Sequence, residues 1–439
     1  MFAKKLLWAA LLMPVAAQAS IDIQRWTTAE GTQILLVERH ENPIVDMRIS
    51  FKGAGSVFNP AGKGELAEFA AALLLSGTEK LDEEAFHARS NDLAVDIGSS
   101  SGEETAALTF RSLSRSENLL PTLDLVNQAL VSPRFDTAVF ERNRSQSITA
   151  LQQSERKPGF VADRALTRLM YPDHPYGNGA NVSVESLGKM SLDDIRAFYR
   201  SRYGKQNAVV AIVGDVDRQQ AEKMAAKALD KLPQKPQHGH AVAPVPEQKA
   251  RHQAIPFPGE QAQIVMGMPL IKRHDPDYYA LVAGNYVLGG GGFDSRLMKV
   301  LRDRHGYTYG AYSRLSPMTE AGGLGIAFST KKANAAPALA AAKKVLAGFI
   351  AEGPTEAELK QAKDNIIGSF PLRFDSNAKL LNYLSLIGVH NLPSDYLEAY
   401  PKAIEALTAE QVKEVWQRRV NPNKLHTVIV GGKAKGKAE

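Results

Sequence analysis

The chain repeats its own pattern at an almost constant offset, and this repeat constrains its fold more than any other feature. A helical pattern that opens at Ser191 is followed by an apolar strand pattern at 209–213. A similar helical pattern opens at Thr408, 217 residues further along, and leads into the strand pattern 427–430. Both openings resemble capping boxes, in which two polar side chains satisfy the first main-chain N–H groups of a helix. The shared order indicates a duplicated domain.

The length of the chain agrees with two domains joined by a linker. At 439 residues the chain exceeds the size at which a single hydrophobic core usually stops growing. Residues 232–252 are rich in Pro, Gln and His and lack periodicity, which is typical of an exposed, semi-extended linker. We therefore predict a signal peptide at 1–19, domains at 20–231 and 253–433, and a tail at 434–439.

Strand and helix patterns predict the fold class. Apolar residues alternate with polar ones from Val45 to Lys52, which predicts a strand with one apolar face and one solvated face. Residues 32–37 are a second strand candidate, and the segment 38–43 between the two strands is predicted to form a hairpin. Strand patterns are followed by long helical patterns in each half. We expect an α+β fold of two homologous domains, each a largely antiparallel sheet covered by helices.

The amino terminus has the pattern of a cleavable secretory signal. Two lysines, Lys4 and Lys5, precede an apolar run from Leu6 to Val15 and a small-x-small end that closes at Ala19. We predict cleavage after Ala19 and export to the periplasm. The alternative is an uncleaved membrane anchor, but the apolar run is short for a membrane span.

The composition excludes some classes of function. A hydrophobic content of 44% and a charged content of 23% are ordinary for a soluble globular protein. The net charge of +6 is a weak bias and the basic residues are scattered, so nucleic-acid binding is not indicated. The chain has no cysteine, which excludes disulfides and is compatible with a periplasmic location.

The segment 66–78, LAEFAAALLLSGT, resembles the active-site helix of a zinc peptidase without its metal ligands. It is similar to the inverted HxxEH motif of the pitrilysin/insulinase metallopeptidases, the family of mitochondrial processing peptidase. In this resemblance the two histidines fall on Glu68 and Ala72, and the glutamate falls on Ala71. Positions 68 and 72 share one face of a helix, where two histidines could bind zinc. A carboxylate and a methyl group supply neither the ligand set nor the general base of a catalytic zinc site.

The remaining ligands are also missing. The resemblance places the third zinc ligand of the family, a glutamate, at the positions of Ile148, Thr149 and Ala150. No two of the ten histidines have HxxxH spacing, and the neighbours His238 and His240 lie in the linker, where solvated side chains are favoured over a metal site. We expect this chain to bind no metal and no other cofactor.

A second family segment is retained. Residues 287–315, VLGGGGFDSRLMKVLRDRHGYTYGAYSRL, strongly resemble the Gly-Gly-Gly-x-x-Ser-Arg-Leu segment of the family and the Leu-Arg-x-x-x-Gly-x-x-Tyr that follows it. In the family an arginine and a tyrosine seven residues apart reach the substrate at the zinc site, and Arg302 and Tyr309 match them. Tyr307 and Thr308 depart from the usual Leu-Ala pair. Both matched side chains can donate hydrogen bonds to the negative charge that develops during peptide hydrolysis.

Each part of this segment has a purely structural alternative. Arg302 could pair with Asp303 on the surface, and Tyr309 could pack at a domain edge. The glycine run lacks the Gly-Lys-Ser/Thr ending of a phosphate loop, so nucleotide binding is not indicated. The run resembles the glycine-rich loop of the non-catalytic subunit of mitochondrial processing peptidase, which implies a flexible loop beside a peptide-binding cavity. A simple strand-to-helix turn is equally compatible; the residues concerned are Gly289, Gly290, Gly291 and Gly292.

The resemblance implies a divided function, in which zinc chemistry is lost and the substrate contacts are kept. It implies a zinc-less subunit of a periplasmic heterodimeric metallopeptidase, with two domains facing each other across a cavity. Zinc is expected in a homologous partner subunit, and Arg302 and Tyr309 are expected to act in trans on a peptide substrate. One alternative is a peptide-binding or scaffold protein without a peptidase partner. Another is an independent enzyme that uses Glu68 with other ligands and holds near-stoichiometric zinc.

Overall fold

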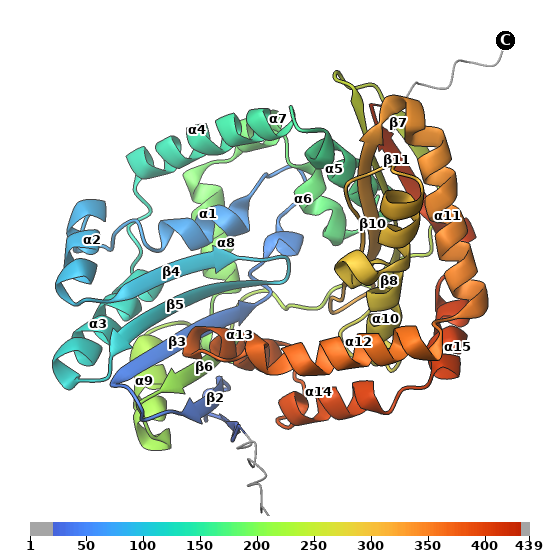
Figure 1. Ribbon diagram of the computed structural model, residues 1–439. Coiled ribbons are helices and arrows are strands. Elements are labelled where there is room, and N and C mark those ends of the chain that lie inside the picture. The colour runs from blue at the N-terminus through green and yellow to red at the C-terminus, as the bar shows by residue number, and fades with distance from the viewer. Residues whose placement is uncertain (1–20, 432–439) are drawn as a thin grey trace, which may run out of the picture.

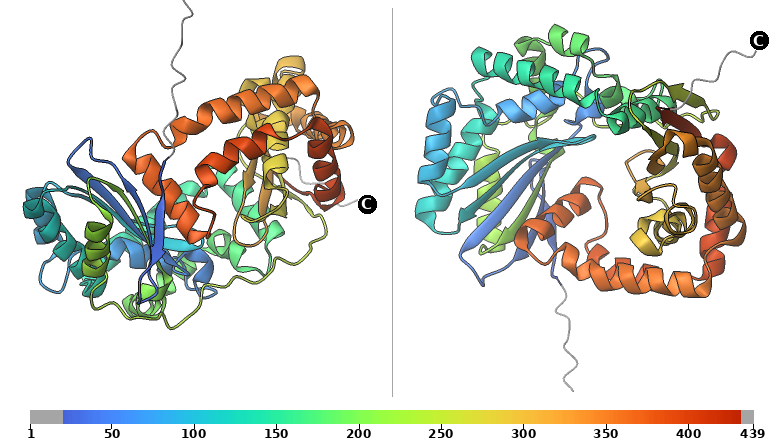
Figure 2. Two further views of the ribbon diagram at one scale, coloured as in Figure 1. Left: turned by 90° about the horizontal axis from the view of Figure 1, so that it is seen from below. Right: turned by 45° about the horizontal axis from the view of Figure 1, so that its top comes forward.

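The computed structural model describes residues 21–431 of the chain. The predicted signal peptide, its cleavage site and the tail at 434–439 lie outside the described residues. The described chain forms two α+β domains, each built on one sheet, and the domains face each other (Figures 1 and 2). Within residues 21–431, no helix combines the length and the apolar character that crossing a membrane requires.

The first domain is built on a sheet of six strands in the order β1-β2-β6-β3-β5-β4. All neighbouring strands are antiparallel except β2 and β6, which run parallel. The strands are β1 Gln24–Thr27, β2 Gln33–Glu38, β3 Ile44–Lys52, β4 Asp96–Ser101, β5 Thr105–Leu113 and β6 Ala208–Gly214. The helices are α1 Leu66–Leu73, α2 Glu83–Asp92, α3 Ser116–Val131, α4 Thr137–Ser154, α5 Pro158–Met170, α6 Asn178–Asn181, α7 Val184–Lys189, α8 Leu192–Arg202 and α9 Arg218–Ala228.

The second domain is built on a sheet of five strands in the order β7-β11-β8-β10-β9. Here β7 and β11 are parallel and the other neighbours are antiparallel. The strands are β7 His252–Ile255, β8 Gln261–Ile271, β9 Ala311–Ser316, β10 Gly322–Lys331 and β11 His426–Val430. The α-helices are α10 Tyr278–Asn285, α11 Ala335–Glu352, α12 Glu356–Ser369, α13 Asn377–Val389, α14 Tyr396–Glu405 and α15 Ala409–Arg419.

The two sheets have the same topology, which confirms the predicted duplication. The order β2-β6-β3-β5-β4 of the first domain corresponds strand by strand to β7-β11-β8-β10-β9, and only β1 has no counterpart among the described residues. The two predicted capping boxes are both formed. The side chains of Ser191 and Asp194 cap α8, and those of Thr408 and Gln411 cap α15. The capping boxes and the strand order therefore both indicate the same duplication of the domain.

Two details of the predicted first sheet are wrong. The strands β2 and β3 do not form a hairpin, because β6 lies between them and pairs with both. The second face of β3 is also not simply solvated, since Asp46 and Ser50 are only 3% and 1% exposed. Asp46 accepts hydrogen bonds from Arg111, and Ser50 is covered by a helix of the other domain. Both errors come from contacts with segments far away in the sequence.

Helix α13 belongs to the second half of the chain but packs on the first sheet, against β6, β3 and β2. In Figure 1 it lies beside β3 and β6. The contact is close because the helix has a small residue near its carboxyl end. A Cβ atom added to Gly388 would lie 2.5 Å from Val209 Cγ1 and 2.6 Å from Leu35 Cδ1. Next to it, the hydroxyl groups of Ser50 and Ser385 form a buried hydrogen bond of 2.9 Å.

Helix α5 makes the reciprocal contact, because it belongs to the first half and packs on β8 and β11 of the second sheet. Here the small residues are on the sheet and the large ones on the helix. A Cβ atom on Gly267 would lie 2.9 Å from Met170 Sδ and 3.1 Å from Leu166 Cδ2, and one on Gly323 would lie 2.8 Å from Met170 Cε. Each domain therefore covers one face of its sheet with a helix from the other half.

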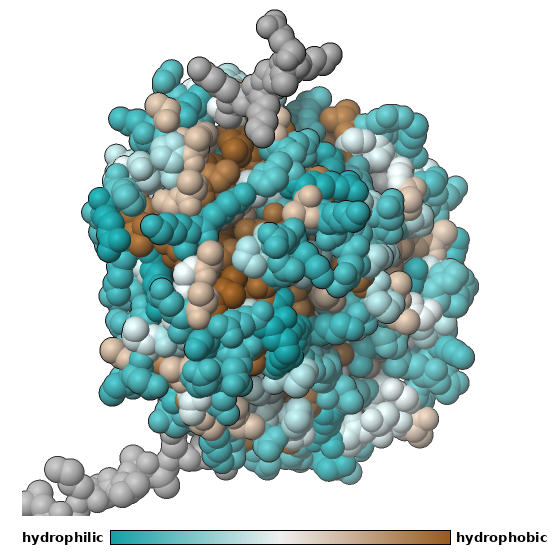
Figure 3. Space-filling model, turned by 90° about the vertical axis from the view of Figure 1, so that its right-hand side faces the viewer, coloured by the Kyte–Doolittle hydropathy of each residue, from teal (hydrophilic) through white to brown (hydrophobic). Residues whose placement is uncertain are grey.

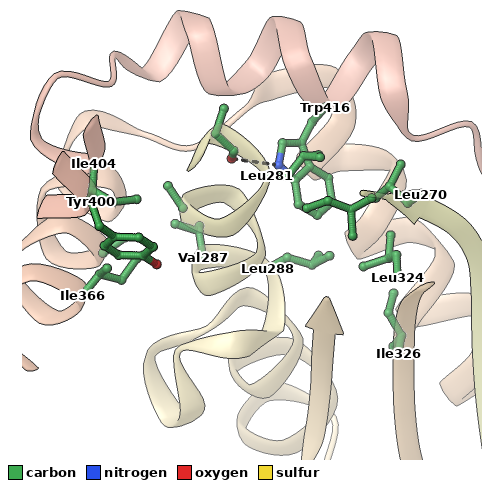
Figure 4. Packing of buried hydrophobic residues seen from close by; sticks show 14 of the residues in the cluster. Leu270, Leu281, Val287, Leu288, Leu324, Ile326, Ile366, Tyr400, Ile404 and Trp416 are labelled. Carbon is green, nitrogen blue, oxygen red and sulfur yellow. Dashed lines mark hydrogen bonds between the residues drawn. The ribbon is translucent and has the colours of Figure 1, made fainter. Parts of the chain in front are cut away.

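The core of the second domain lies between its sheet and α10, α11, α12, α14 and α15 (Figure 4). The Trp416 ring is fully buried, packs edge-on against Phe349 at 4.8 Å, and donates a hydrogen bond from Nε1 to the carbonyl of Ala280 at 3.3 Å. On the outer side, near α11 and α15, hydrophilic side chains form much of the surface and apolar residues show between them (Figure 3). The large apolar surfaces of these helices thus point inward.

Candidate functional site

Helix α1 carries the positions onto which the resemblance places two zinc ligands and a general base. Glu68 is half-buried and its carboxylate accepts a hydrogen bond of 3.3 Å from Asn59 Nδ2. Burial raises the pKa of the Glu68 carboxyl group. Ala71 is buried, and Ala72 is exposed. Helix α1 therefore presents one carboxylate, held by an amide, where the motif would present two imidazoles and a general base.

The positions predicted for the third ligand lie on α4, which contacts α1. Ile148 packs against the cluster that includes the buried face of α1, and Thr149 and Ala150 are exposed. Within residues 21–431, no three His, Asp or Glu side chains are grouped so that they could bind a metal ion. The chain has no donor set for zinc in this described part.

Arg302 and Tyr309 lie in the second domain, around the end of an irregular helix. Residues Met298–Arg304 form a π-helix. This form is rare in proteins overall, but where it occurs it is often at a functional site. Gly306, at φ 61°, turns the chain back toward β9. The Tyr309 side chain is 92% exposed and makes no hydrogen bond within the described residues. The predicted alternative in which Tyr309 packs at a domain edge does not fit this exposure.

Arg302 is oriented by an aromatic ring more than by a carboxylate. Its guanidinium lies 4.7 Å from the ring centre of Phe293, which is 65% exposed. Its Nη1 also forms an ion pair with Asp303 Oδ1 at 3.6 Å, which is the pairing given as the structural alternative, although this distance is too long for a direct hydrogen bond. A cation over a ring keeps its N–H donors free for another acceptor. Arg302 and Tyr309 thus offer uncommitted donors on one exposed segment.

The glycine run precedes this segment and connects two helical stretches, so it is not the strand-to-helix turn given as an alternative. Gly289 and Gly290 belong to a second π-helix, Tyr286–Gly290. Cβ atoms on Gly289, Gly290 and Gly291 would lie within 2.7 Å of Ser313, Asn285 and Tyr286, so close packing requires these glycines. Gly292 has φ 63° and no neighbour within 4 Å, so it is the part of the run that is open to a ligand.

Arg296, in the same family segment, has a structural role. Its guanidinium donates to both carboxylate oxygens of Glu358, at 2.9 and 2.7 Å, and to the carbonyl of Gly353 at 2.8 Å. Glu358 also closes the capping box of α12 with Thr355. The arginine therefore anchors the glycine-rich segment to α12 and positions the residues that follow it.

A cavity of about 420 Å³ lies between the two domains, and we call it the interdomain cavity. Glu103 of the first domain, Asp163 of α5, and Tyr312 and Arg314 of β9 are among its lining residues. Desolvation raises the pKa of both carboxyl groups, and Arg314 opposes the shift in each case. Neither carboxylate forms an ion pair with Arg314 in the described chain. The cavity therefore holds charges of both signs that are available to a ligand.

Sequence inspection did not single out Glu103, Asp163, Tyr312 or Arg314. The alternation of β9 holds a partial signal, because Tyr312 and Arg314 are exposed while Ala311 and Ser313 are buried. The sequence could not show that α5 and the loop before β5 meet β9. Arg302 and Tyr309 are not among the residues that line this cavity; they lie on the adjoining segment that leads into β9.

One side of the cavity is closed by a bridge between the domains. The Glu104 carboxylate accepts hydrogen bonds from the Thr319 main-chain N–H at 3.1 Å and from its hydroxyl at 2.9 Å. It also accepts one from the Tyr176 hydroxyl at 2.8 Å, and that hydroxyl accepts one from the Glu320 N–H at 2.8 Å. This bridge fixes the first domain against the loop after β9.

Comparison with known proteins identifies the class. A family model described as Insulinase (Peptidase family M16) matches residues 33–181, and a model described as Peptidase M16 inactive domain matches residues 189–366. A crystal structure described as a peptidase M16 inactive domain from Pseudomonas fluorescens is 32% identical, with a TM-score of 0.89 over 95% of this chain and 100% of that chain. The chain belongs to peptidase family M16, the insulinase family.

Individual relatives agree with this assignment. A protein of Helicobacter pylori named non-peptidase homolog YmxG is 27% identical over 421 residues, which cover 96% of this chain and 96% of that protein. The structure of the periplasmic protease PqqL from Escherichia coli has a TM-score of 0.77 at 18% identity and covers 99% of this chain and 48% of that chain. The PqqL likeness shows the fold alone. The matches confirm the two-domain architecture that the duplication predicted.

Proposed function

We propose that this chain is the zinc-less subunit of a heterodimeric periplasmic peptidase, in which it binds peptide and supplies Arg302 and Tyr309 to the zinc site of a homologous partner. The observation that carries the proposal is the contrast between the two family segments. Helix α1 has no zinc ligands, whereas Tyr309 is 92% exposed and Arg302 rests on Phe293 with its donors free. A peptide carbonyl oxygen held at the zinc ion of a partner subunit would accept hydrogen bonds from these donors.

The fold supports peptide as the ligand. The strands β4 and β9 are edge strands of the two sheets, and β9 contributes Tyr312 and Arg314 to the interdomain cavity. An edge strand presents unpaired main-chain groups that an extended peptide can pair with. The aromatic and charged side chains around the cavity supply contacts for peptide side chains. Folded proteins are too large for a cavity of about 420 Å³, so short unstructured peptides are the expected substrates.

The partner and the location rest on relatives. The yeast mitochondrial-processing peptidase subunit beta is 19% identical to this chain over 247 residues, and by its name it is part of a larger assembly. The PqqL structure is of a periplasmic protease, which supports the export expected from the amino-terminal pattern. Zinc is expected in the partner subunit, and this chain is expected to bind none.

The test is reconstitution with a zinc-bearing homologue from the same cell and an assay on unstructured fluorogenic peptides. We expect activity from the mixture only. Arg302→Ala should lower kcat/KM by roughly 100-fold or more, the usual effect of removing a donor to a developing oxyanion. Assembly of the two chains, followed by analytical ultracentrifugation, should be unchanged. Arg304→Ala is the matched control, because Arg304 is an exposed arginine on the same π-helix.

Two further variants separate the alternatives. Glu68→Gln should leave the mixed complex active, whereas an enzyme that uses Glu68 as a ligand would lose both zinc and turnover. A scaffold protein without a peptidase partner would restore proteolysis to no homologue. Full activity of Arg302→Ala in the complex would remove the proposed role of this residue.

A further inference from the structure

A second cavity, of about 240 Å³, lies where α13 ends on the first sheet, and we call it the junction pocket. Four basic side chains from four segments line it. Lys52 closes β3, His240 belongs to the linker, His274 follows β8, and His390 follows α13. The pocket therefore collects groups from the first domain, the linker and the second domain in one place.

The junction pocket holds one lysine that has no ion-pair partner within residues 21–431, beside three imidazoles. Lys52 forms no ion pair with any carboxylate of the described chain, and desolvation together with Arg25 lowers the pKa of its ammonium group. Burial, with Arg273, His274 and Lys52, lowers the pKa of His390 to about 4. Burial and Lys52 also lower the pKa of His240. All these shifts have the direction expected where a negative partner is missing.

Two features oppose this charge. Glu104 lines the pocket and its carboxylate offsets one positive charge, although its oxygens accept hydrogen bonds from Thr319 and Tyr176 and form no ion pair with Lys52 within residues 21–431. The carboxyl end of α13 contributes main-chain carbonyls, and His274 Nε2 is hydrogen-bonded to the carbonyl of His390. A helix terminus corresponds to roughly half an elementary charge. Lys52, with Arg25 acting on it and Arg273 acting on His390, outweighs the helix end and Glu104 together, and these cations also disfavour a metal cation at the histidines.

The geometry points to a binding site for an oxyanion, a phosphate or carboxylate group, held by Lys52, His240, His274 and His390 at the junction of the two domains. Charged groups that bind oxyanions do so through short, charge-assisted hydrogen bonds. The four side chains come from both domains and the linker. A bound anion would therefore hold together the segments that frame the interdomain cavity. This site is independent of the zinc partner and of the proposed peptidase role.

The test uses inorganic sulfate, whose charge is constant between pH 6 and pH 8, and follows binding by calorimetry and thermal unfolding of the mature chain. We expect binding that tightens by roughly 10-fold from pH 8 to pH 6, because a bound anion favours the protonated imidazoles. Sodium chloride of equal ionic strength is the salt control. Parallel titrations with phosphate and succinate at pH 7.5 show which oxyanion is preferred.

Lys52→Met should have two effects that the loss of a purely structural lysine would not have. In anion-free buffer the variant should melt at a higher temperature than the wild type, because it removes an unpaired, partly buried charge. The same variant should lose the sulfate-induced rise in Tm and at least 10-fold in affinity. Lys227→Met, which removes an exposed lysine paired with Asp124 in the first domain, should retain both.

His240→Gln provides a second variant, in an exposed linker position where folding is not at risk. It should weaken sulfate binding several-fold and reduce the pH dependence. The inference is overturned if sulfate stabilises the wild type no more than chloride does, or if Lys52→Met and Lys227→Met respond to sulfate alike.

Discussion

The hydroxyl groups of Ser50 and Ser385 lie 2.9 Å apart in a buried hydrogen bond that joins β3 of the first domain to α13 of the second. Ser50→Ala or Ser385→Ala should each lower the free energy of unfolding by about 1–2 kcal/mol, because the partner hydroxyl is left without a hydrogen bond in the interior. The double variant should cost less than the sum of the two. Urea unfolding followed by circular dichroism measures all three, and strict additivity would show that the hydroxyls do not interact in solution.

Gly388 and Gly368 are both helical glycines, and alanine should have opposite effects at the two. A methyl group at Gly388 meets Val209 and Leu35 within 2.6 Å, so Gly388→Ala should lower stability by about 1–3 kcal/mol through overpacking. Gly368, on α12, has no neighbour within 4 Å, so Gly368→Ala should raise stability by up to about 1 kcal/mol through helix propensity. Thermal and urea unfolding provide the comparison. Equal shifts in both variants would contradict the close contact of α13 with the first sheet.

The Arg296–Glu358 pair should make stability depend on pH in the acid range. Partial burial disfavours the charged carboxylate, but hydrogen bonds from Arg296 and from Thr355 outweigh this effect and lower the pKa of Glu358 to about 2. The lowered pKa means that the stabilisation is complete above the ordinary pKa of 4.5 and is lost as the pH falls toward 2. Arg296→Met should cost about 2 kcal/mol at pH 7, where the pair is partly buried, and less at pH 3.

The exposed pair Arg142–Glu83 is the matched control for this prediction. It has similar two-point geometry, but Arg142 is about half exposed. Arg142→Met should therefore leave stability nearly unchanged at either pH, because solvent and salt screen an exposed pair. Unfolding in urea at the two pH values distinguishes the pairs, and an equal cost for both would show that the anchoring of the glycine-rich segment by Arg296 is weak.

Local patterns in the sequence predicted the parts of the fold that are held by local interactions. The capping boxes at Ser191 and Thr408 and the strands that follow each helix recur in both domains, and they revealed the duplication before any contact was known. The loss of zinc ligands at Glu68, Ala71 and Ala72 could be recognised because a helical motif has fixed spacing. Within residues 21–431 no group of three His, Asp or Glu side chains is placed to bind a metal ion, and the expectation that this chain binds none stays a prediction.

Features that depend on distant contacts could not be predicted in the same way. The strand β6 separates β2 from β3 although it follows them by more than 150 residues, so the expected hairpin was wrong. The four basic residues of the junction pocket stand on separate segments with no shared motif. The role of Arg302 and Tyr309 rests on the family resemblance, and it stays a prediction until the mixed complex is assayed.

Because α5 and α13 each cover the sheet of the other half, neither half is complete alone. Cutting the linker would give two fragments. In each fragment one face of the sheet would be exposed to solvent, and one helix would expose its apolar side. The two fragments would have to associate before either could be stable. The linker between the halves therefore keeps each sheet beside the helix that covers it.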